Sequence, residues 1–403
     1  MFGQEVECMY NKKMCELGNC RSAIRELFEY GKVRAKEMGA DKVYDFSLGN
    51  PSVPSPNEIK ETLIQLLTEN TSNSLHGYTS AQGALETRVA IACSLNKKYR
   101  AKLCPENIYI TVGAAAGLCI VLKALNSGND EFIVLAPFFP EYKVFIESQG
   151  GVFKQVPFNE SDFSVNLSVL ENSITNKTKG VIVNSPNNPS GVVYSEETVK
   201  AIAEILKKKS QEYKKPIYII SDEPYRELVY DGKRVPFLMN YYDNTIICYS
   251  FSKSLSLPGE RIGYIAVSEK TEDHKNVYAS ICGAGRGLGY VCAPSLFQKV
   301  IEKCIDAKTD IAEYDRNRKL IYGELVKMGY ECIKPDGAFY LFIKSPEKDA
   351  NVFCDKAKQK GLLIVPGDSF GAPGYARIAY CVDYEMIKRS LPAFKELISE
   401  YSL

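Results

Sequence analysis

The 403-residue chain has no tryptophan, only two histidines and almost no net charge. With His76 and His274 as the only imidazoles, a zinc site is not expected. The 50 basic residues nearly balance the 49 acidic ones, and the net charge of +1 gives no indication of a nucleic-acid partner. No stretch reaches the roughly 18 uninterrupted apolar residues of a membrane-spanning helix, so no membrane partner is expected either.

The cysteines also lack any regular arrangement. There are 13, an odd number, with no C-x-x-C pair among them. This pattern indicates free thiols in a reducing compartment rather than a disulfide framework. Residues 1–5 carry an acid early and lead into no apolar run of signal-peptide length. Together these features predict a cytoplasmic protein.

Short apolar runs alternate with helical stretches through the middle of the chain. The runs are rich in Val, Ile, Tyr and Thr, which is typical of strands buried on both faces of a largely parallel sheet. Strands are predicted at residues 108–112, 132–135, 152–157, 181–183, 217–220, 245–249 and 262–267. Helices are predicted at residues 20–38, 115–125, 141–149 and 196–209. The alternation predicts an α/β fold with a doubly wound sheet.

Beyond residue 291 the pattern changes to that of a second, smaller lobe. Long helical stretches are followed by predicted strands at residues 339–343 and 362–365, a glycine loop at 366–368 and a closing helix. We therefore predict a large domain over residues 57–290. The smaller domain is predicted to combine residues 1–56 with residues 291–403.

Unusual residues cluster directly after the predicted strands. Gly113 follows the first strand, Phe139 the second, Asn188 the fourth, Asp222 the fifth and Lys253 the sixth. Ligands of open α/β sheets bind beyond the carboxyl ends of the strands. The small residues that begin at position 113 also let backbone N–H groups approach an anion at a helix N-terminus. The sequence therefore predicts a ligand site at this edge of the sheet.

Lys253 carries the most specific chemistry. It lies in Ser250-Phe251-Ser252-Lys253, with Arg261 shortly after it. A lysine amine can form an imine with an aldehyde, while the two hydroxyls and the arginine can hold a phosphate dianion. An aldehyde and a phosphate on one small molecule describe pyridoxal 5′-phosphate (PLP), which proteins bind through a lysine. The alternative is a surface lysine in a serine-rich loop.

Other residues suit a PLP site, although each has an ordinary structural alternative. Asp222 would keep a pyridine nitrogen protonated, or would cap its strand. Phe139 can stack on a planar ring or pack in the core. Tyr225 and Asn188 carry groups that can bond a ring oxygen. Arg377 can pair with a substrate carboxylate through two hydrogen bonds, or lie on the surface.

A series of motifs in this order resembles the class I aminotransferases of PLP fold type I, especially aspartate and aromatic aminotransferases. The resemblance runs from about Tyr44 to Tyr401. Its motifs are Leu-Gly-Asn-Pro at 48–51, Tyr-Thr-Ser-Ala-Gln-Gly at 78–83, Pro-Phe-Phe-Pro-Glu-Tyr at 137–142, Asn-Asn-Pro-Ser-Gly at 187–191, Asp-x-x-Tyr at 222–225, Ser-Phe-Ser-Lys at 250–253, Pro-Gly-x-x-Phe-Gly at 366–371 and Gly-Tyr-Ala-Arg-Ile at 374–378.

The resemblance implies a fold and a set of roles. The fold is a large domain with a mostly parallel seven-stranded sheet flanked by helices, plus a smaller α+β domain, together spanning residues 44–401. The catalytic residues would be Lys253, Asp222 and Tyr225. PLP would be bound by Gly113, Ala114, Ala115, Phe139, Asn188, Asp222, Tyr225, Ser250, Ser252, Lys253, Arg261 and Tyr78. The substrate carboxylate would be bound by Gly49, Asn188 and Arg377.

The resemblance also implies a homodimer with its active sites at the interface. Tyr78 would then reach the phosphate in the neighbouring subunit. The chain departs from relatives at Val112, where many have asparagine, and at Ala115, where one aspartate-using subgroup has lysine. That route to a substrate side-chain carboxylate is therefore absent. Arg286 is a candidate replacement, the alternative being a solvated arginine.

The implied activity is transamination between an L-amino acid and a 2-oxo acid by a ping-pong mechanism, through a Schiff base on Lys253. A PLP-dependent C–S β-lyase acting on a compound such as cystathionine shares the same residues and remains the alternative. PLP-binding transcription regulators also use this domain. Only about forty residues precede the 48–51 motif, however, with no basic recognition helix among them. The sequence leaves the amino acid open, because pocket shape decides it.

Overall fold

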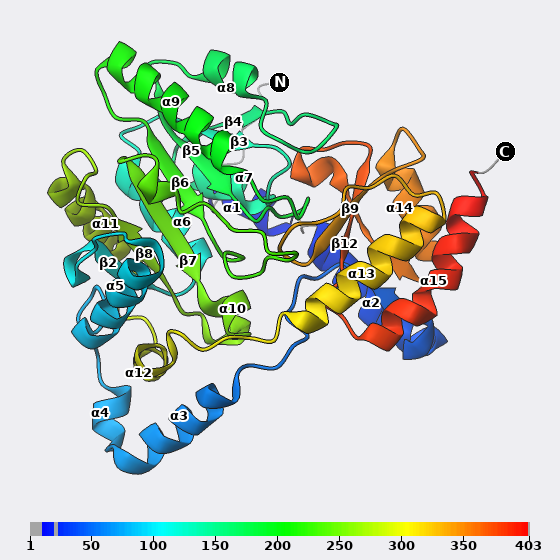
Figure 1. Cartoon of the computed structure of the whole chain (residues 1–403), viewed down its shortest axis with the longest axis horizontal. Coiled ribbons are helices and arrows are strands. Elements are labelled where there is room, and N and C mark those ends of the chain that lie inside the picture. The colour runs from blue at the N-terminus through cyan, green and yellow to red at the C-terminus, as the bar shows by residue number, and fades with distance from the viewer. Residues whose placement is uncertain (1–9, 20–22, 402–403) are drawn as a thin grey trace, which may run out of the picture.

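The structure is a computed structural model that describes residues 10–19 and 23–401 (Figure 1). The helix predicted over residues 20–38 is confirmed from residue 23 onward as α2 (Ala23–Met38). Its first three residues, and residues 1–5, lie outside the described residues. A short helix, α1 (Lys12–Asn19), precedes it. Within the described ranges, every helix is too short or too polar to cross a membrane.

A seven-stranded sheet forms the centre of the larger lobe (Figure 1). Its order across the sheet is β2 (Ile108–Thr111), β8 (Gly263–Val267), β7 (Thr245–Ser250), β6 (Tyr218–Asp222), β5 (Thr178–Asn184), β3 (Glu131–Leu135) and β4 (Val152–Val156). Neighbouring strands are parallel except at β8, which runs antiparallel to both β2 and β7. All seven predicted strands are confirmed, as is the mostly parallel α/β sheet.

Helices cover both faces of this sheet. Val134 and Ile220 pack in one core cluster, whereas their sequence neighbours Ile133 and Ile219 pack in another. Helices of the first cluster are α6 (Ala114–Leu125), α7 (Glu141–Ser148) and α11 (His274–Leu288), and those of the second are α8 (Leu167–Ser173) and α9 (Glu196–Tyr213). Burial on both faces accounts for strands that are apolar throughout.

A further group of helices covers the β2–β8–β7 end of the sheet, on the same face as α8 and α9. Its helices are α3 (Asn57–Glu69), α4 (Ser72–His76), α5 (Leu85–Tyr99) and α12 (Ser295–Cys304). The sequence pattern did not predict the first three, whereas α12 lies in the helical stretch expected after residue 291. In Figure 1, α3 and α4 extend below the rest of the molecule. α12 packs against α3 and α5, although it follows the boundary predicted at residue 290. That boundary stays a prediction.

The smaller lobe is built on a three-stranded antiparallel sheet in the order β11 (Val365–Pro366), β12 (Tyr375–Ala379) and β9 (Tyr340–Lys344). Around it lie α2, α13 (Ala312–Lys327), α14 (Ala350–Gln359) and α15 (Tyr384–Ser399). β1 (Tyr44–Asp45) pairs with β10 (Leu362–Leu363) and so ties the N-terminal segment to this lobe. The strand predicted at residues 362–365 is thus split between β10 and β11.

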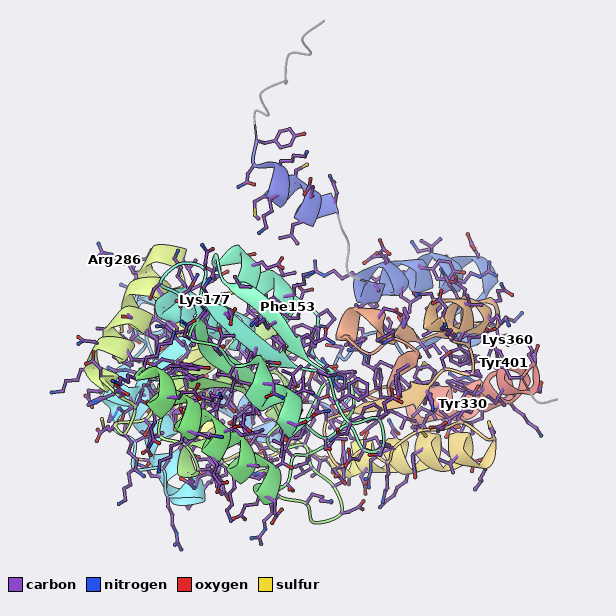
Figure 2. The ribbon with its side chains drawn as sticks, turned by 90° about the horizontal axis from the view of Figure 1, so that it is seen from above. Phe153, Lys177, Arg286, Tyr330, Lys360 and Tyr401 are labelled. Carbon is purple, nitrogen blue, oxygen red and sulfur yellow. The ribbon has the colours of Figure 1, made fainter. Side chains whose placement is uncertain are left out.

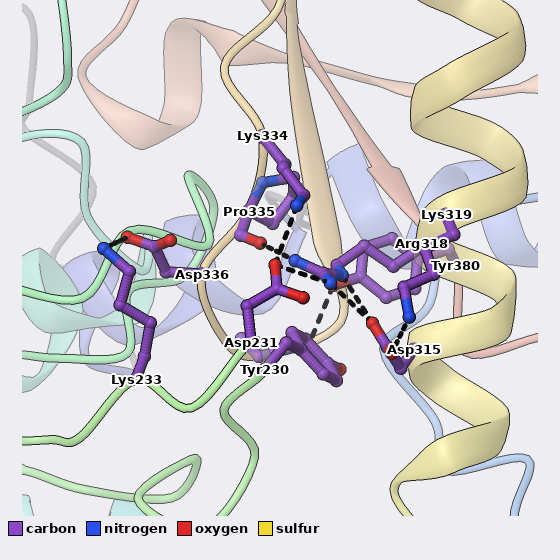
Figure 3. A network of polar contacts seen from close by, with 11 residues as sticks. Tyr230, Asp231, Lys233, Asp315, Arg318, Lys319, Lys334, Pro335, Asp336 and Tyr380 are labelled. Carbon is purple, nitrogen blue, oxygen red and sulfur yellow. Dashed lines mark hydrogen bonds and ion pairs between the residues drawn. The ribbon is translucent and has the colours of Figure 1, made fainter.

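A buried arginine connects the two lobes (Figure 3). Arg318, on α13, is fully buried and donates to Asp315 and, over 3.0 Å, to Oδ2 of Asp231. Asp231 belongs to the larger lobe, in the stretch of chain that follows β6. It also accepts a hydrogen bond from Lys334 at 2.7 Å. Hydrogen bonds from Lys334 and Arg318 lower the pKa of Asp231 to about 2. Since the arginine also lies 4.5 Å from the centre of the Tyr230 ring, it holds this segment by charge and by packing.

Candidate active site

The antiparallel direction of β8 determines which residues lie together at the edge of the large sheet where the parallel strands end. β2, β5, β6 and β7 end there, whereas β8 begins there. Gly263, the first residue of β8, pairs with Thr111 on one side and Ser250 on the other. The turn before β8, with Arg261, is thereby brought beside the residues that follow β2 and β7.

Lys253 lies on α10 (Phe251–Ser254), the single turn of helix after β7. Its Nζ donates to the carbonyl oxygen of Gly49 at 2.6 Å and lies 5.3 Å from the centre of the Phe339 ring. Burial lowers the pKa of Lys253 to about 8, and the guanidinium groups of Arg261 and Arg377 act in the same direction. This is a half-buried amine beside the loop at residues 48–51, not a surface lysine.

Asp222 ends β6 and is almost completely buried. Tyr142, on α7, donates its hydroxyl to Oδ2 at 2.5 Å, whereas Oδ1 is buried without a hydrogen-bond partner. Burial raises the pKa of Asp222 to about 7, and the Tyr142 hydrogen bond acts against that rise. Phe139 is half-buried and meets the Tyr142 ring edge to face, with ring centres 5.7 Å apart. A buried acceptor without a partner is costly, so Oδ1 is suited to a ligand that donates a hydrogen bond or carries positive charge.

One asparagine connects Asp222 to the loop after β5. Asn184 donates from Nδ2 to the backbone oxygen of Asp222 at 2.9 Å. Its Oδ1 accepts from the backbone nitrogen of Asn188 at 2.8 Å. The loop of residues 185–191 is thus fastened to the neighbouring strand, and Asn188 is held at the sheet edge.

Arg377 reaches the same edge from the smaller lobe, on β12. It is buried, and it donates from Nη1 to Asn188 Oδ1 at 3.0 Å and from Nη2 to the Ser47 carbonyl at 2.5 Å. Its guanidinium carbon lies 4.6 Å from the centre of the Tyr340 ring and 4.9 Å from that of Phe370. Burial lowers the pKa of Arg377, and its Nε has no hydrogen-bond partner. A buried cation with a free donor suits an anionic ligand.

Tyr225 and Gly49 both contact the side chain of Tyr340, which belongs to the smaller lobe. The hydroxyl groups of Tyr225 and Tyr340 lie 2.9 Å apart in a buried hydrogen bond. A Cβ atom at Gly49 would collide with the Tyr340 hydroxyl, so only glycine lets the loop at residues 48–51 approach this closely. The carbonyl that accepts from Lys253 is therefore held against Tyr340.

Gly113 lies between β2 and α6 with a φ of +90°, in the region that favours glycine. A Cβ atom there would stand 2.8 Å from Nη2 of Arg261. Without one, the arginine lies beside the amino end of α6, where the first backbone N–H groups, including those of Ala114 and Ala115, have no partner within the helix. The hydroxyl oxygens of Ser250 and Ser252 are 2.8 Å apart. These groups form a cradle for a small dianion.

Two predicted residues are not gathered at this edge within the chain. Tyr78 follows α4 and is 99% exposed. Arg286 is exposed on α11, and Figure 2 shows it at the end of the molecule opposite Tyr330 and Tyr401 of the smaller lobe. Neither residue therefore lies with the others at this edge of the sheet.

Four residues of the site were given no role by the sequence: Ser47, Tyr142, Asn184 and Tyr340. Tyr142 and Asn184 were within reach of sequence reasoning, because one ends the 137–142 motif and the other directly precedes the loop of residues 185–191. Ser47 and Tyr340 carried no local signal. They come to the edge through the smaller lobe, and Tyr340 reads as one more apolar position of a core strand.

The residues present fit PLP. The free Oδ1 of Asp222 suits a protonated pyridine nitrogen, and the cradle around Gly113 suits a phosphate. The Lys253 amine has its pKa lowered toward neutrality, which suits a nucleophile that bonds an aldehyde. The buried guanidinium of Arg377 suits a carboxylate on a second molecule.

The chain is similar to many proteins of one family. The model for aminotransferase class I and II matches residues 41–394. The chain is 31% identical to a probable aspartate aminotransferase of Methanocaldococcus jannaschii, over 93% of this chain and 96% of that protein. It is 32% identical to the (5-formylfuran-3-yl)methyl phosphate transaminase of the same organism, over 90% of this chain and 94% of that protein.

The fold is similar over nearly its whole length to solved structures. An aminotransferase from Eubacterium rectale matches with a TM-score of 0.97 and 56% identity, over 98% of this chain and 100% of that one. Aspartate aminotransferase from Thermotoga maritima matches with a TM-score of 0.86 and 27% identity, over 97% and 100% of the two chains. The chain belongs to the aminotransferase class I and II family, whose members depend on PLP.

Proposed function

We propose that this aminotransferase moves the amino group of an L-amino acid to a 2-oxo acid by a ping-pong mechanism, in a site at the edge of the large sheet. One observation carries the proposal. A half-buried amine, a buried carboxylate with a free oxygen and a buried arginine with a free N–H converge from α10, β6 and β12. These are the groups needed to hold PLP and an amino acid side by side.

The cofactor's place follows from the donors and acceptors. Asp222 would pair with the ring nitrogen through Oδ1, while Tyr142 holds the other oxygen. Asn188 and Tyr225 would contact the ring oxygen, and Phe139 would cover one ring face. The phosphate would be held by Ser250, Ser252, Arg261 and the amides of Gly113, Ala114 and Ala115. When bound, PLP supplies an aldehyde and an electron-withdrawing ring that stabilises negative charge at the substrate α-carbon.

Lys253 is proposed to attach the cofactor and to move the proton. With a pKa of about 8, roughly a tenth of the free amine is neutral at pH 7 and can accept a proton from the substrate α-carbon. Its hydrogen bond to the Gly49 carbonyl keeps it at the carboxylate side of the site. The two arginines that disfavour its charge therefore help it act as a base.

Arg377 is proposed to bind the substrate α-carboxylate, together with Gly49 and Asn188. Its planar guanidinium is buried between the rings of Tyr340 and Phe370, so its orientation is determined by packing before any substrate arrives. A carboxylate can bond two N–H groups of one guanidinium at once. Preorganised in this way, Arg377 aligns the α-carbon for Lys253.

For the amino donor we propose aspartate or an aromatic amino acid. The names of several relatives support this range. They include aspartate aminotransferases, a probable aspartate/prephenate aminotransferase of Aquifex aeolicus and an aromatic-amino-acid aminotransferase of Thermococcus litoralis. Ala115 leaves no cation for a second carboxylate at its position, so a dicarboxylic substrate would need a charge from elsewhere.

We also propose a homodimer in the cytoplasm. Tyr78 supports the dimer, because a fully exposed tyrosine in a matched motif would have its cofactor contact only across an interface. The cysteines among the described residues are all free thiols, which supports a reducing compartment.

The activity is tested by single-turnover chemistry. PLP-loaded enzyme is mixed with one amino acid at a time, without any 2-oxo acid, and the products are identified by mass spectrometry. We expect one equivalent of the matching 2-oxo acid per site, and further turnover only after a second 2-oxo acid is added. A C–S β-lyase would instead release pyruvate and ammonia repeatedly from cystathionine, an outcome that would contradict transamination.

A further inference from the structure

Tyr340 contacts several parts of the site without an assigned role in it. It lies on β9 and is almost completely buried. Its hydroxyl is 2.9 Å from that of Tyr225, and its ring lies 4.6 Å from the guanidinium carbon of Arg377. The same hydroxyl occupies the space that a Cβ atom at Gly49 would need. One residue thus contacts the cofactor side, the carboxylate side and the loop that faces Lys253.

The register of the small sheet explains this position. Arg377 pairs with Phe342, and Ala379 pairs with Tyr340. Because side chains two residues apart on a strand share a face, Tyr340 is a diagonal neighbour of Arg377 on that face. The Tyr340 hydroxyl then extends past the arginine to the end of β6, where Tyr225 lies. This hydroxyl pair is one of the contacts between the two lobes.

We propose that Tyr340 is a positioning residue for amino-group transfer: its hydroxyl holds the Tyr225 hydroxyl toward the cofactor, and its ring holds the Arg377 guanidinium toward the substrate carboxylate. The inference rests on the proposed function, since Tyr225 and Arg377 have these tasks only if PLP and an amino acid bind here.

The hydroxyl acts through donation. If Tyr225 donates to an oxygen of the bound cofactor, its own oxygen accepts from Tyr340, and donors in such a chain strengthen one another. Without the Tyr340 hydroxyl, the Tyr225 hydroxyl loses this partner and can turn away. The other charged and titratable groups around the pair are Asp222, Arg377 and Cys381, which all remain in a Tyr340 variant.

The ring acts through packing and charge. Arg377 is buried, and the face of an aromatic ring attracts a desolvated guanidinium. The Arg377 guanidinium also contacts the Phe370 ring, so two aromatic rings restrict the orientation of the guanidinium plane. The two parts of Tyr340 therefore predict two different defects, one on the cofactor and one on substrate binding.

The test separates these parts with Tyr340→Phe and Tyr340→Leu. For Tyr340→Phe we expect the pH midpoint of the visible absorbance change of the PLP-bound enzyme to rise by about 0.5–1 pH unit. The dissociation constant for PLP should rise several-fold and kcat should fall, while KM for the amino acid stays near wild type. Tyr340→Leu should add an increase in KM on the order of tenfold, because the arginine loses its ring.

Tyr330→Phe is the matched control. Tyr330 is also a buried tyrosine of the smaller lobe, and its hydroxyl donates to the Phe394 carbonyl at 2.8 Å (Figure 2). It should lower thermal stability without moving the absorbance midpoint. In the double variant Tyr225→Phe/Tyr340→Phe, the midpoint should shift no further than in Tyr225→Phe alone, because the second hydroxyl acts only through the first.

Different outcomes would contradict the role of Tyr340 and the proposed aminotransferase activity. If wild-type enzyme neither bound PLP nor released a 2-oxo acid, the proposed function itself would fail. If wild-type enzyme did both, and Tyr340→Phe matched Tyr330→Phe in absorbance midpoint and PLP affinity, Tyr340 would be a packing residue only. Additive shifts in the double variant would equally overturn the role through Tyr225.

Discussion

Arg377 Nη1 donates to Asn188 Oδ1 over 3.0 Å, although the two residues are 189 positions apart and belong to different lobes. One lies on β12 of the smaller sheet and the other in the loop that follows β5 of the larger sheet. The bond joins the proposed carboxylate site to the proposed cofactor site, with both partners buried. A substrate carboxylate that binds here would join an existing hydrogen-bond network, whereas a solvated arginine would offer no such network.

This network makes Arg377→Lys informative. Lysine keeps the positive charge but cannot reproduce the planar fork that serves Asn188, Ser47 and a carboxylate together. We expect kcat/KM for the amino acid to fall by an amount equivalent to about 2–5 kcal/mol. The decarboxylated amine, already a poor substrate, should lose little further. An equal loss for both substrates would mean that Arg377 supports the fold or the cofactor instead.

Lys253→Ala removes the amine proposed to attach PLP and to move the proton. Borohydride reduction of PLP-loaded wild type should leave the cofactor covalently on the peptide that contains Lys253, as identified by mass spectrometry. The variant should show no such adduct and no measurable turnover, because nucleophile and base are lost together. Lys207→Ala, which changes an exposed lysine of α9, should behave as wild type. A reduced adduct on another lysine in wild type would reassign the role.

Asp222 should make the cofactor-free protein less stable as pH rises. Burial raises its pKa from 3.8 to about 7, so between these values the folded protein binds a proton that the unfolded chain has lost. Stability therefore falls as pH rises from about 4 to 7. Asp222→Asn lacks this dependence. Its unfolding free energy relative to that of wild type should therefore increase by on the order of 3 kcal/mol from pH 4 to pH 8.

The measurement is urea unfolding of the two cofactor-free proteins across this pH range. PLP loading provides the control. A protonated ring nitrogen beside Oδ1 would favour the ionised carboxylate, so bound PLP should stabilise wild type far more than Asp222→Asn. Parallel stability curves for the two cofactor-free proteins would show that Asp222 ionises in the folded protein as freely as in the unfolded chain.

From the exposure of Tyr78 we predict that each active site contains residues of two subunits. Tyr78→Phe should weaken PLP binding, and sedimentation should show a dimer for both proteins. Mixing the Tyr78→Phe and Lys253→Ala dimers under exchange conditions should restore part of the wild-type activity, because half of the sites in a hybrid contain both intact residues. A fully active monomer, or no recovery after proven subunit exchange, would contradict the shared site.

Arg318→Met tests the connection between the lobes (Figure 3). The variant keeps an apolar stem under Tyr230 but leaves Asp231 and Asp315 without their buried cation. We expect a loss of about 2 kcal/mol in unfolding free energy, below the cost of breaking a fully buried pair because both carboxylates are partly exposed. Lys319→Met removes an exposed pair with the same Asp315 and should cost less than about 1 kcal/mol. Equal losses would show that burial of Arg318 adds nothing.

The large sheet and the order of the site motifs were predictable from the sequence. Strands buried on both faces must be apolar at successive positions, and most of the seven runs that became β2 to β8 follow this pattern. The edge strand β4, with Lys154 and Gln155, does not. In a parallel sheet the residues that follow the strands converge on one edge, so the sequence predicts that Gly113, Asn188, Asp222 and Lys253 lie together.

Tertiary structure alone decided how the second lobe completes the site. β12 is a short run with a central arginine, so local pattern did not predict a strand there, and only its pairing with β9 buries Arg377 beside Tyr340. The 2.6 Å hydrogen bond from Lys253 to Gly49 and the Tyr225–Tyr340 hydroxyl pair are likewise contacts between distant segments. Packing between such segments also leaves Oδ1 of Asp222 buried without a partner. Periodicity reports which face of an element is buried but not which partner covers it, because that choice depends on packing between elements far apart in the chain.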